Sequence, residues 1–395
     1  MGSVIVGGAR TPIGKLLGVF ASLTAVDLGA IAVDAALRRA RIAPDQVDQV
    51  VLGHVLPAGC GQLPARQAAA QAGIPLTVPA MAVSKVCLAG LNAVATADMM
   101  IGSGLADVVV AGGMESMTQA PHLLRGSRQG TRFGDATMID HVAHDALWDA
   151  FTDQSMGALT EHHDTGDAAV SRADADAFSV RSHRLAASSS DILGAEIVPV
   201  TVPHQHGDDR EIGTDEGIRA DTTVEALGRL RPAFTTGGGI TAGSSSQLSD
   251  GAAAMVVMSE DAAVRHGCTP LARIGAYGTV AGPDSSLQLQ PARAILAACR
   301  RAHLDPAELD LIEINEAFAS VALASARQLG LTRHQIEERV NIHGGAIALG
   351  HPPGMSGARL VLHLALELHR RGRGTGVASL CGGGGQGDAL VLEAV

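Results

Sequence analysis

The sequence lacks long hydrophobic runs and any excess of basic residues. No uninterrupted apolar stretch reaches the ~18 residues that a membrane-spanning helix needs. The N-terminus has no charged segment followed by a long apolar one, so we expect no signal peptide. A net charge of −11 gives no general affinity for nucleic acid or for anionic membranes. We therefore expect a soluble, cytoplasmic protein that binds neither.

Cysteine and lysine are also scarce. The cysteines are odd in number and widely spaced, which argues against a disulfide framework and favours a reducing compartment. They lie at positions 60, 87, 268, 299 and 381. Lysine occurs twice against 27 arginines, and the sequence alone offers no functional account of that bias.

Hydrophobic residues make up 46% of the 395 residues, and 48 are glycine. This length suggests two or three domains with a large buried core. Apolar runs and amphipathic segments alternate through the first part of the chain, which indicates a parallel sheet covered on both faces by helices. Strands are predicted over Val4–Gly8, Val47–Val55, Val78–Val83 and Asp107–Ala111, and helices over Thr24–Arg41, Leu63–Ala72 and Leu91–Ile101.

From about Ala120 to Thr241 the alternation fades, and histidine, aspartate, serine and arginine become more frequent. A helix is predicted over Arg172–Ser188, the edge of a strand pair over Leu193–Val202, and a short helical region over Arg219–Leu230. We interpret this stretch as an insertion above the sheet.

An internal repeat appears after the insertion. Gly29–His54 matches Pro291–Glu316 at a constant offset of 262 residues, with nine identities over 26 positions. Further on, Cys87–Gly90 corresponds roughly to Gly354–Gly357. Two copies of one α/β unit, with an insertion after the first, explain this pattern.

Cys87 is the first candidate for chemistry. It lies where the strand ending at Val83 turns into the next helix, and the start of a helix favours a thiolate over a thiol. We therefore expect a nucleophilic cysteine. The alternative is a small buried hydrophobic residue, which describes most free cysteines.

Three stretches of the second copy add further candidates. Asn315 and Glu316 lie at a strand-to-helix turn, where asparagine is also a common helix cap. His351 lies in a loop fixed by glycines and a Pro-Pro pair. Cys381 precedes a run of glycines that lacks the lysine of a phosphate-binding loop, so backbone N–H groups facing a reacting oxygen are the better interpretation.

Together these motifs resemble the thiolase family over essentially the whole chain. SKVCLAG, GGMESM, NEAFA, GGAIALGHPPGMSG and CGGGGQGD occur in the family's order and spacing. The resemblance implies an α/β duplicated thiolase fold, with two βαβαβαββ halves layered α-β-α-β-α. The first half would comprise residues 1–119 and 242–268, the inserted loop domain 120–241, and the second half 269–395.

The resemblance also implies ping-pong acyl transfer between coenzyme A thioesters. Cys87 matches the nucleophile that becomes acylated, and His351 the base that activates it. Cys381 matches the second cysteine, which moves the α-proton of the incoming acetyl thioester. Asn315 matches the residue holding a water that, with His351, stabilises the enolate oxygen. The backbone N–H groups of Cys87 and Gly383 match the donors that face the acyl-enzyme carbonyl. No metal or other cofactor is implied.

The same resemblance assigns the coenzyme A groove. Its matching residues are Arg219, Leu230, Phe234, Ala242, Ser246, Leu248 and Phe318. For Arg219 the alternative is an ordinary solvated surface charge. The expected substrates and products are acetyl-CoA, acetoacetyl-CoA and CoA, and the expected assembly is a homo-oligomer, either a dimer or a tetramer.

Some positions depart from the family pattern. Ser155 stands where acetoacetyl-forming members place a histidine, Leu287 and Gln288 replace a Met-Gly pair near the acyl pocket, and His343 replaces an asparagine. Chain length therefore stays open between an acetyl-CoA C-acetyltransferase and a broader 3-ketoacyl-CoA thiolase of fatty acid and lipid metabolism. A ketoacyl synthase would not need Cys381, and a catalytically dead binding module would need neither thiol.

Overall fold

The computed structural model describes residues 2–203 and 208–395. Within them one hydrogen-bonded sheet runs through the molecule in the order β14-β15-β16-β13-β1-β12-β5-β3-β4, with β2 beside β12. Its strands are β1 (Ser3–Arg10), β2 (Gly14–Lys15), β3 (Gln49–Gly53), β4 (Ala80–Val83), β5 (Val108–Ser116), β12 (Ser249–Ser259), β13 (Ala272–Ala281), β14 (Leu311–Ile314), β15 (Thr375–Gly382) and β16 (Gln386–Glu393).

The prediction of a parallel sheet is only half right. Strand β3 pairs in parallel with β4 and β5, and β14 pairs in parallel with β15. The centre of the sheet is antiparallel, because β12 lies between β1 and β5 and because β15 and β16 form a hairpin. The strand directions are mixed because only the outer strands are joined through the crossover helices that parallel neighbours need.

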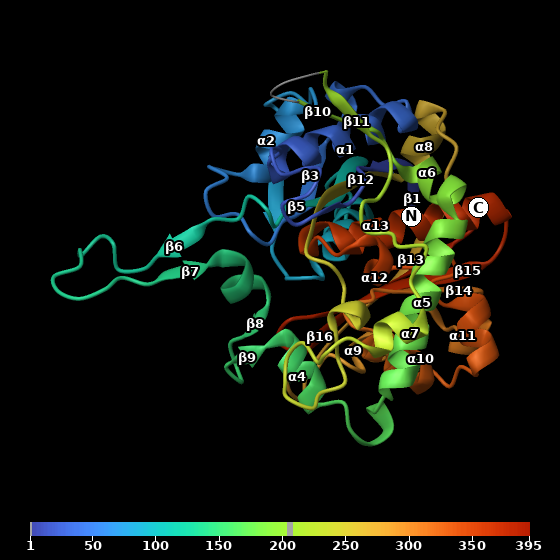
Figure 1. Cartoon of the computed structure of the whole chain (residues 1–395). Coiled ribbons are helices and arrows are strands. Elements are labelled where there is room, and N and C mark those ends of the chain that lie inside the picture. Colours follow the sequence, from blue (N-terminus) through green and yellow to red (C-terminus); the bar gives the residue numbers. More distant parts are fainter. Residues whose placement is uncertain (1, 204–207) are drawn as a thin grey trace.

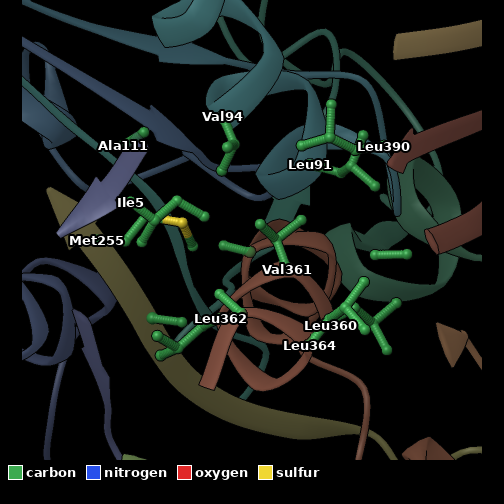
Figure 2. Close-up of a cluster of buried hydrophobic side chains, with 14 of the residues drawn as sticks. Ile5, Leu91, Val94, Ala111, Met255, Leu360, Val361, Leu362, Leu364 and Leu390 are labelled. Atoms are coloured by element: carbon green, nitrogen blue, oxygen red, sulfur yellow. The ribbon is translucent and has the colours of Figure 1, made fainter. Parts of the chain in front are cut away.

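Three hydrophobic cores define the layers. The inner core is built by α3 (Ala89–Gly102) and α13 (Pro353–Arg371), which pack against each other between the two parts of the sheet. Figure 2 shows Leu91 and Val94 of α3 facing Val361 of α13, with Leu390 of the second half beside them. The outer cores lie under α1 (Ala25–Ala40) and under α9 (Gln290–Ala302).

The remaining helices cover these layers. In the two halves they are α2 (Pro64–Gln71), α8 (Glu260–His266), α10 (Ala319–Gln328), α11 (Arg333–Arg339) and α12 (Ala346–Leu349). The resulting order, helices-sheet-helices-sheet-helices, is the layered α/β fold expected from the sequence. Among the described helices, none combines the length and the apolar character needed to cross a bilayer.

The repeat is confirmed in three dimensions. Helix α1 corresponds to α9, and the 3₁₀ turn Pro44–Gln46 corresponds to Pro306–Glu308 at the offset of 262 residues. Even the helix ends agree, because Arg41 and His303 cap α1 and α9 in the left-handed conformation, with φ of 58° and 56°.

The inserted segment is partly irregular, as expected. Its hairpin, β6 (His122–Leu124) with β7 (Met138–Asp140), projects away from the body of the molecule (Figure 1). The rest contains the short pairs β8 (Trp148–Asp149) with β9 (Gln154–Ser155) and β10 (Val200–Val202) with β11 (Arg210–Ile212), and the helices α4 (Met156–His162), α5 (Arg172–Ser188), α6 (Ser190–Glu196) and α7 (Val224–Gly228).

The strand expected over Leu193–Val202 is wrong for its first half, which belongs to α6. The helix places Leu193 and Glu196 three residues apart on one face, so that Leu193 joins the inner core and Glu196 forms a buried ion pair with Arg10. Only Val200–Val202 is a strand. The helical region predicted over Arg219–Leu230 shrinks to α7.

Candidate active site

Cys87 lies in a strained turn between β4 and α3. The residue before it, Val86, has a φ of 49°, a left-handed conformation that a β-branched residue rarely adopts. The turn closes through hydrogen bonds from Leu88 N to Lys85 O and from Ala89 N to Val86 O. Such strain, of order 1–3 kcal/mol, concentrates at functional sites and persists only where surrounding packing enforces it.

The thiolate expected at Cys87 is not favoured in this structure. Part of its side chain faces a cavity, but the surrounding protein raises the pKa of the thiol to about 12. A hydrogen bond from its own backbone N–H lowers the pKa less than burial raises it, and the nearby Glu115 carboxylate raises it further. Burial therefore outweighs the start of the helix, and Cys87 needs a base in order to react.

His351 is held with one ring nitrogen free for that task. Its Nδ1 lies 2.5 Å from Ser356 Oγ, and the same hydroxyl donates to Pro352 O at 2.9 Å. Because Ser356 uses its proton on the carbonyl, we assign the ring proton of His351 to Nδ1. Nε2 then carries the lone pair, 3.4 Å from Asn315 Nδ2. Burial lowers the pKa of His351 to about 4, so the ring is neutral.

Cys381 lies near the end of β15, opposite Gly387 of β16, and Gly383 follows in the turn of the β15–β16 hairpin. Cys381 is fully buried, and burial followed by the nearby Cys87 raises the pKa of its thiol above the usual range. A Cβ placed on Gly383 would lie 3.5 Å from Val86 Cγ2, so this glycine packs directly against the Cys87 turn. The hairpin of the second half thus meets the nucleophile turn of the first.

One cavity of about 420 Å³ joins these groups. Cys87, His351, Cys381 and Gly383 all line it, and the buried Asn315 places its Nδ2 3.4 Å from His351 Nε2. The structure therefore brings together all five residues that the sequence nominated for catalysis. Within residues 2–203 and 208–395, no group of three or more histidine, cysteine or acidic side chains is arranged to hold a metal ion.

The predicted coenzyme A contacts divide into two groups. The cavity is lined by Phe234, Ser246, Leu248 and Phe318, and the rings of Phe234 and Phe318 meet edge-to-face with centroids 5.8 Å apart. The other three contacts, Arg219, Leu230 and Ala242, do not line the cavity.

The acyl-pocket positions divide similarly. Ser155 and Leu287 line the cavity, and Ser155 Oγ also caps α4 by accepting from Ala158 N at 3.3 Å. Gln288 lies outside it and donates to the carbonyl of Thr160 instead. Other lining side chains had not been expected from the sequence, among them Met117, Leu147, Trp148, Met156 and Gln247. Of these, only Trp148 carried a signal, as the single tryptophan of the chain.

Gln247 and Glu115 are supporting residues that the sequence did not reveal. The carbonyl of Gln247 accepts the His351 N–H at 3.1 Å, and its side chain donates to Gly217 O and Ile347 O. The fully buried Glu115 carboxylate accepts N–H groups from Leu56 and, at the first turn of α13, from Gly354. Burial raises the pKa of Glu115 to about 8.

Comparisons with known proteins cover the whole chain. The family model "Thiolase, N-terminal domain" matches residues 3–261, and "Thiolase, C-terminal domain" matches residues 268–394. A probable acetyl-CoA acetyltransferase of Mycobacterium leprae is 56% identical over 395 residues, covering 100% of this chain and 99% of that protein. An acetyl-CoA acetyltransferase of Cupriavidus necator is 45% identical, with 99% and 98% covered.

Two further relatives extend this picture. A probable acetyl-CoA acyltransferase of Staphylococcus epidermidis is 44% identical, with 97% of this chain and 96% of that protein covered. The crystal structure of the Bacillus anthracis acetyl-CoA acetyltransferase superimposes with a TM-score of 0.95 at 37% identity, covering 100% of this chain and 99% of that one.

Proposed function

The chain belongs to the thiolase family, and from this premise we propose that it is an acetyl-CoA C-acetyltransferase. It condenses two acetyl-CoA molecules reversibly to acetoacetyl-CoA and CoA through an acetyl-Cys87 intermediate. The observation that carries the proposal is the single cavity in which two thiols and a neutral imidazole meet. Relatives with the acetyltransferase name cover the whole chain and support the same reaction.

The first half-reaction acetylates Cys87. His351 Nε2 takes the thiol proton as the sulfur attacks the thioester carbonyl, and the leaving CoA thiolate then takes that proton. Because the pKa of Cys87 is raised to about 12 and that of His351 is lowered to about 4, a stable ion pair is disfavoured. Proton transfer therefore accompanies attack instead of preceding it.

The second half-reaction forms the carbon–carbon bond. Cys381 passes its proton to His351 and, as a thiolate, removes a proton from the methyl carbon of the second acetyl-CoA. The protonated His351, together with a water held by Asn315, stabilises the enolate oxygen. The enolate carbon attacks the acetyl carbonyl, and Cys87 leaves as a thiolate that recovers a proton from His351. Burial, which raises the pKa of Cys381, makes its thiolate a stronger base.

A broader 3-ketoacyl-CoA thiolase is the second candidate. It is favoured by the apolar lining of the cavity, which includes Met117, Leu147 and Leu287, and by the small Ser155 in the same lining. The acyltransferase name of the Staphylococcus epidermidis relative points in the same direction. The two candidates differ in the acyl chain that they cleave, not in the chemistry.

One enzyme preparation tests both candidates. Thiolysis of acetoacetyl-CoA is compared with thiolysis of a medium-chain 3-ketoacyl-CoA, before and after removal of metals with EDTA. A strong preference for acetoacetyl-CoA, unchanged by EDTA, supports the acetyltransferase without a metal. Comparable or faster cleavage of the longer chain supports the broader thiolase. Activity on neither substrate would overturn both.

We further propose a cytoplasmic enzyme of lipid metabolism that works as a homo-oligomer, either a dimer or a tetramer. The support for the homo-oligomer is exposed apolar surface. Met81 on the edge strand β4 is 36% exposed, and Phe133 and Met138 in and beside the projecting hairpin are 100% and 62% exposed. Light scattering on the purified protein checks the assembly, and a monomeric mass at micromolar concentration would contradict it.

A further inference from the structure

Lys85 is one of only two lysines in a chain with 27 arginines. It lies two residues before Cys87, and it does not line the cavity. Its Nζ lies 2.8 and 2.9 Å from the two carboxylate oxygens of Asp388. Two hydroxyl oxygens are also within reach, Thr279 Oγ1 at 3.3 Å and Tyr277 Oη at 3.4 Å.

Asp388 belongs to the other half of the molecule. It is fully buried on β16, where it pairs across the hairpin with Leu380, the neighbour of Cys381. Lys85 therefore ties the turn that carries Cys87 to the hairpin that carries Cys381. Tyr277, the single tyrosine of the chain, extends this link because it also accepts a hydrogen bond at 3.0 Å from Asn92 on α3.

The geometry of the site explains a lysine at this position. Four acceptor oxygens surround one point, which suits a compact ammonium group with three rotatable donors. The planar fork of arginine needs more space and aims its donors outward. In a chain that uses arginine for nearly all of its cations, these contacts favour a lysine at this position.

We propose that Lys85 and Asp388 are a positioning pair that sets the separation of the Cys87 and Cys381 thiols. This proposal rests on the proposed function. Loss of the pair should slow the reactions that need both thiols, and it should not slow the reaction that needs Cys87 alone. Acyl transfer between acetyl-CoA and free CoA uses Cys87 with His351. Thiolysis of acetoacetyl-CoA also needs Cys381, because the departing acetyl-CoA carbanion must be protonated.

The test compares these two reactions in Lys85→Arg and Lys85→Met. Exchange of labelled CoA into acetyl-CoA measures the first, and thiolysis of acetoacetyl-CoA the second. We expect exchange close to the wild-type rate, and thiolysis reduced about 10²-fold, the cost of a misplacement near 1 Å. The ratio of the two rates is the readout, because loss of folded protein lowers both equally.

Two controls complete the design. Lys15→Arg changes the other lysine, whose side chain forms no ion pair or hydrogen bond with the part of the chain that the structure describes, so it should leave the ratio unchanged. Lys85→Gln combined with Asp388→Asn removes both charges together and replaces the ion pair with an amide pair. It should therefore recover thiolysis relative to Lys85→Gln alone.

Each outcome is decisive. Equal losses of exchange and thiolysis, a wild-type ratio in Lys85→Arg, or no recovery in the double variant would overturn the positioning pair. If the wild-type enzyme catalyses neither reaction, the proposed function fails instead, and the two failures are thereby distinguished.

Discussion

The two copies of the repeat share their scaffold and differ in their chemistry. In both, a helix ends in a left-handed cap, a 3₁₀ turn follows, and a buried strand begins. The difference comes at the later helix starts. The first copy places Cys87 before α3, and the second places His351 and Pro352 before α13, which begins at Pro353. The two copies have the same packed scaffold, whereas each half supplies a different part of one site.

The helix starts can share a site because glycines on β5 and at the start of α3 let the first half approach α13 backbone to backbone. A Cβ on Gly113 would lie 1.9 Å from Gly354 O, and one on Gly90 would lie 2.7 Å from Ala358 N. Both distances are too short for any side chain. The glycines are therefore as necessary for the site as the thiols, because they allow the first half to come this close to the second.

The largest expected effect comes from removing the reactive group of the first copy. Cys87→Ala should lower thiolysis of acetoacetyl-CoA by at least ~10⁴-fold, because no acyl-enzyme forms. The matched control is Cys60→Ala, a half-buried cysteine outside the cavity, which should leave the rate unchanged. Steady-state kinetics with mass spectrometry of the acetylated protein checks both, and acetylation in Cys87→Ala would contradict the assignment.

The next largest effect comes from breaking the close contact between β5 and the start of α13. Gly113→Ala forces a methyl group into the Gly354 carbonyl, and because a backbone atom cannot move aside, it should cost about 3 kcal/mol or more. Gly102→Ala, at the exposed end of α3 with no atom within 4 Å, should instead gain ~0.5–1 kcal/mol. Thermal unfolding measures both changes. Similar unfolding midpoints in the two variants would show that the close contact does not matter.

The shared scaffold was predictable from sequence because its signals are local. Apolar periodicity, glycine stops and the repeat itself located the helices and most strands. The protonation of Cys87 was not predictable, since its burial depends on α13 and the β15–β16 hairpin, both far along the chain. Helix α6 was not predicted for the same reason, because the partners of Leu193 and Glu196 are distant in the sequence. The role of Glu115 was not predicted either, because its hydrogen bonds join the two halves.

Acid should destabilise the fold through buried histidines, which lie in both halves and in the inserted segment. Burial lowers the pKa of His351, His54 and His183 to about 4, and it also lowers the pKa of His343. The unfolded chain takes up these protons near pH 6.5 while the folded chain does not. The free energy of unfolding should therefore be highest above pH 6.5 and fall toward pH 4, by up to ~1.4 kcal/mol per pH unit for each histidine.

His343→Asn tests this acid sensitivity in the second copy. His343 Nδ1 lies 3.1 Å from His363 Nε2. Removing the ring should flatten the fall of stability between pH 6.5 and 4 by up to ~1.4 kcal/mol per pH unit. Above pH 7 the slope should not change. Urea unfolding at a series of pH values provides the measurement, and an unchanged acid slope would exclude His343 as a contributor.

The smallest effect tests whether the two copies are truly equivalent at their helix ends. Arg41 and His303 are exposed and adopt left-handed conformations, and the next residues, Ile42 and Leu304, close the same backbone hydrogen bond, to Leu37 and Cys299, at 3.0 Å. Because glycine adopts this conformation without strain, Arg41→Gly and His303→Gly should each stabilise the fold by ~0.5–1 kcal/mol.

The double glycine variant should give the sum of the two gains, since the sites lie in different halves and share no partner. Arg41→Ala and His303→Ala keep the Cβ and therefore should gain nothing, which separates backbone strain from loss of the side chain. Thermal unfolding midpoints report the gains. Unequal gains from the two glycine variants would mean that the halves have diverged in their scaffold as well as in their chemistry. The two copies would then share the path of the backbone but not the energetics of their helix ends.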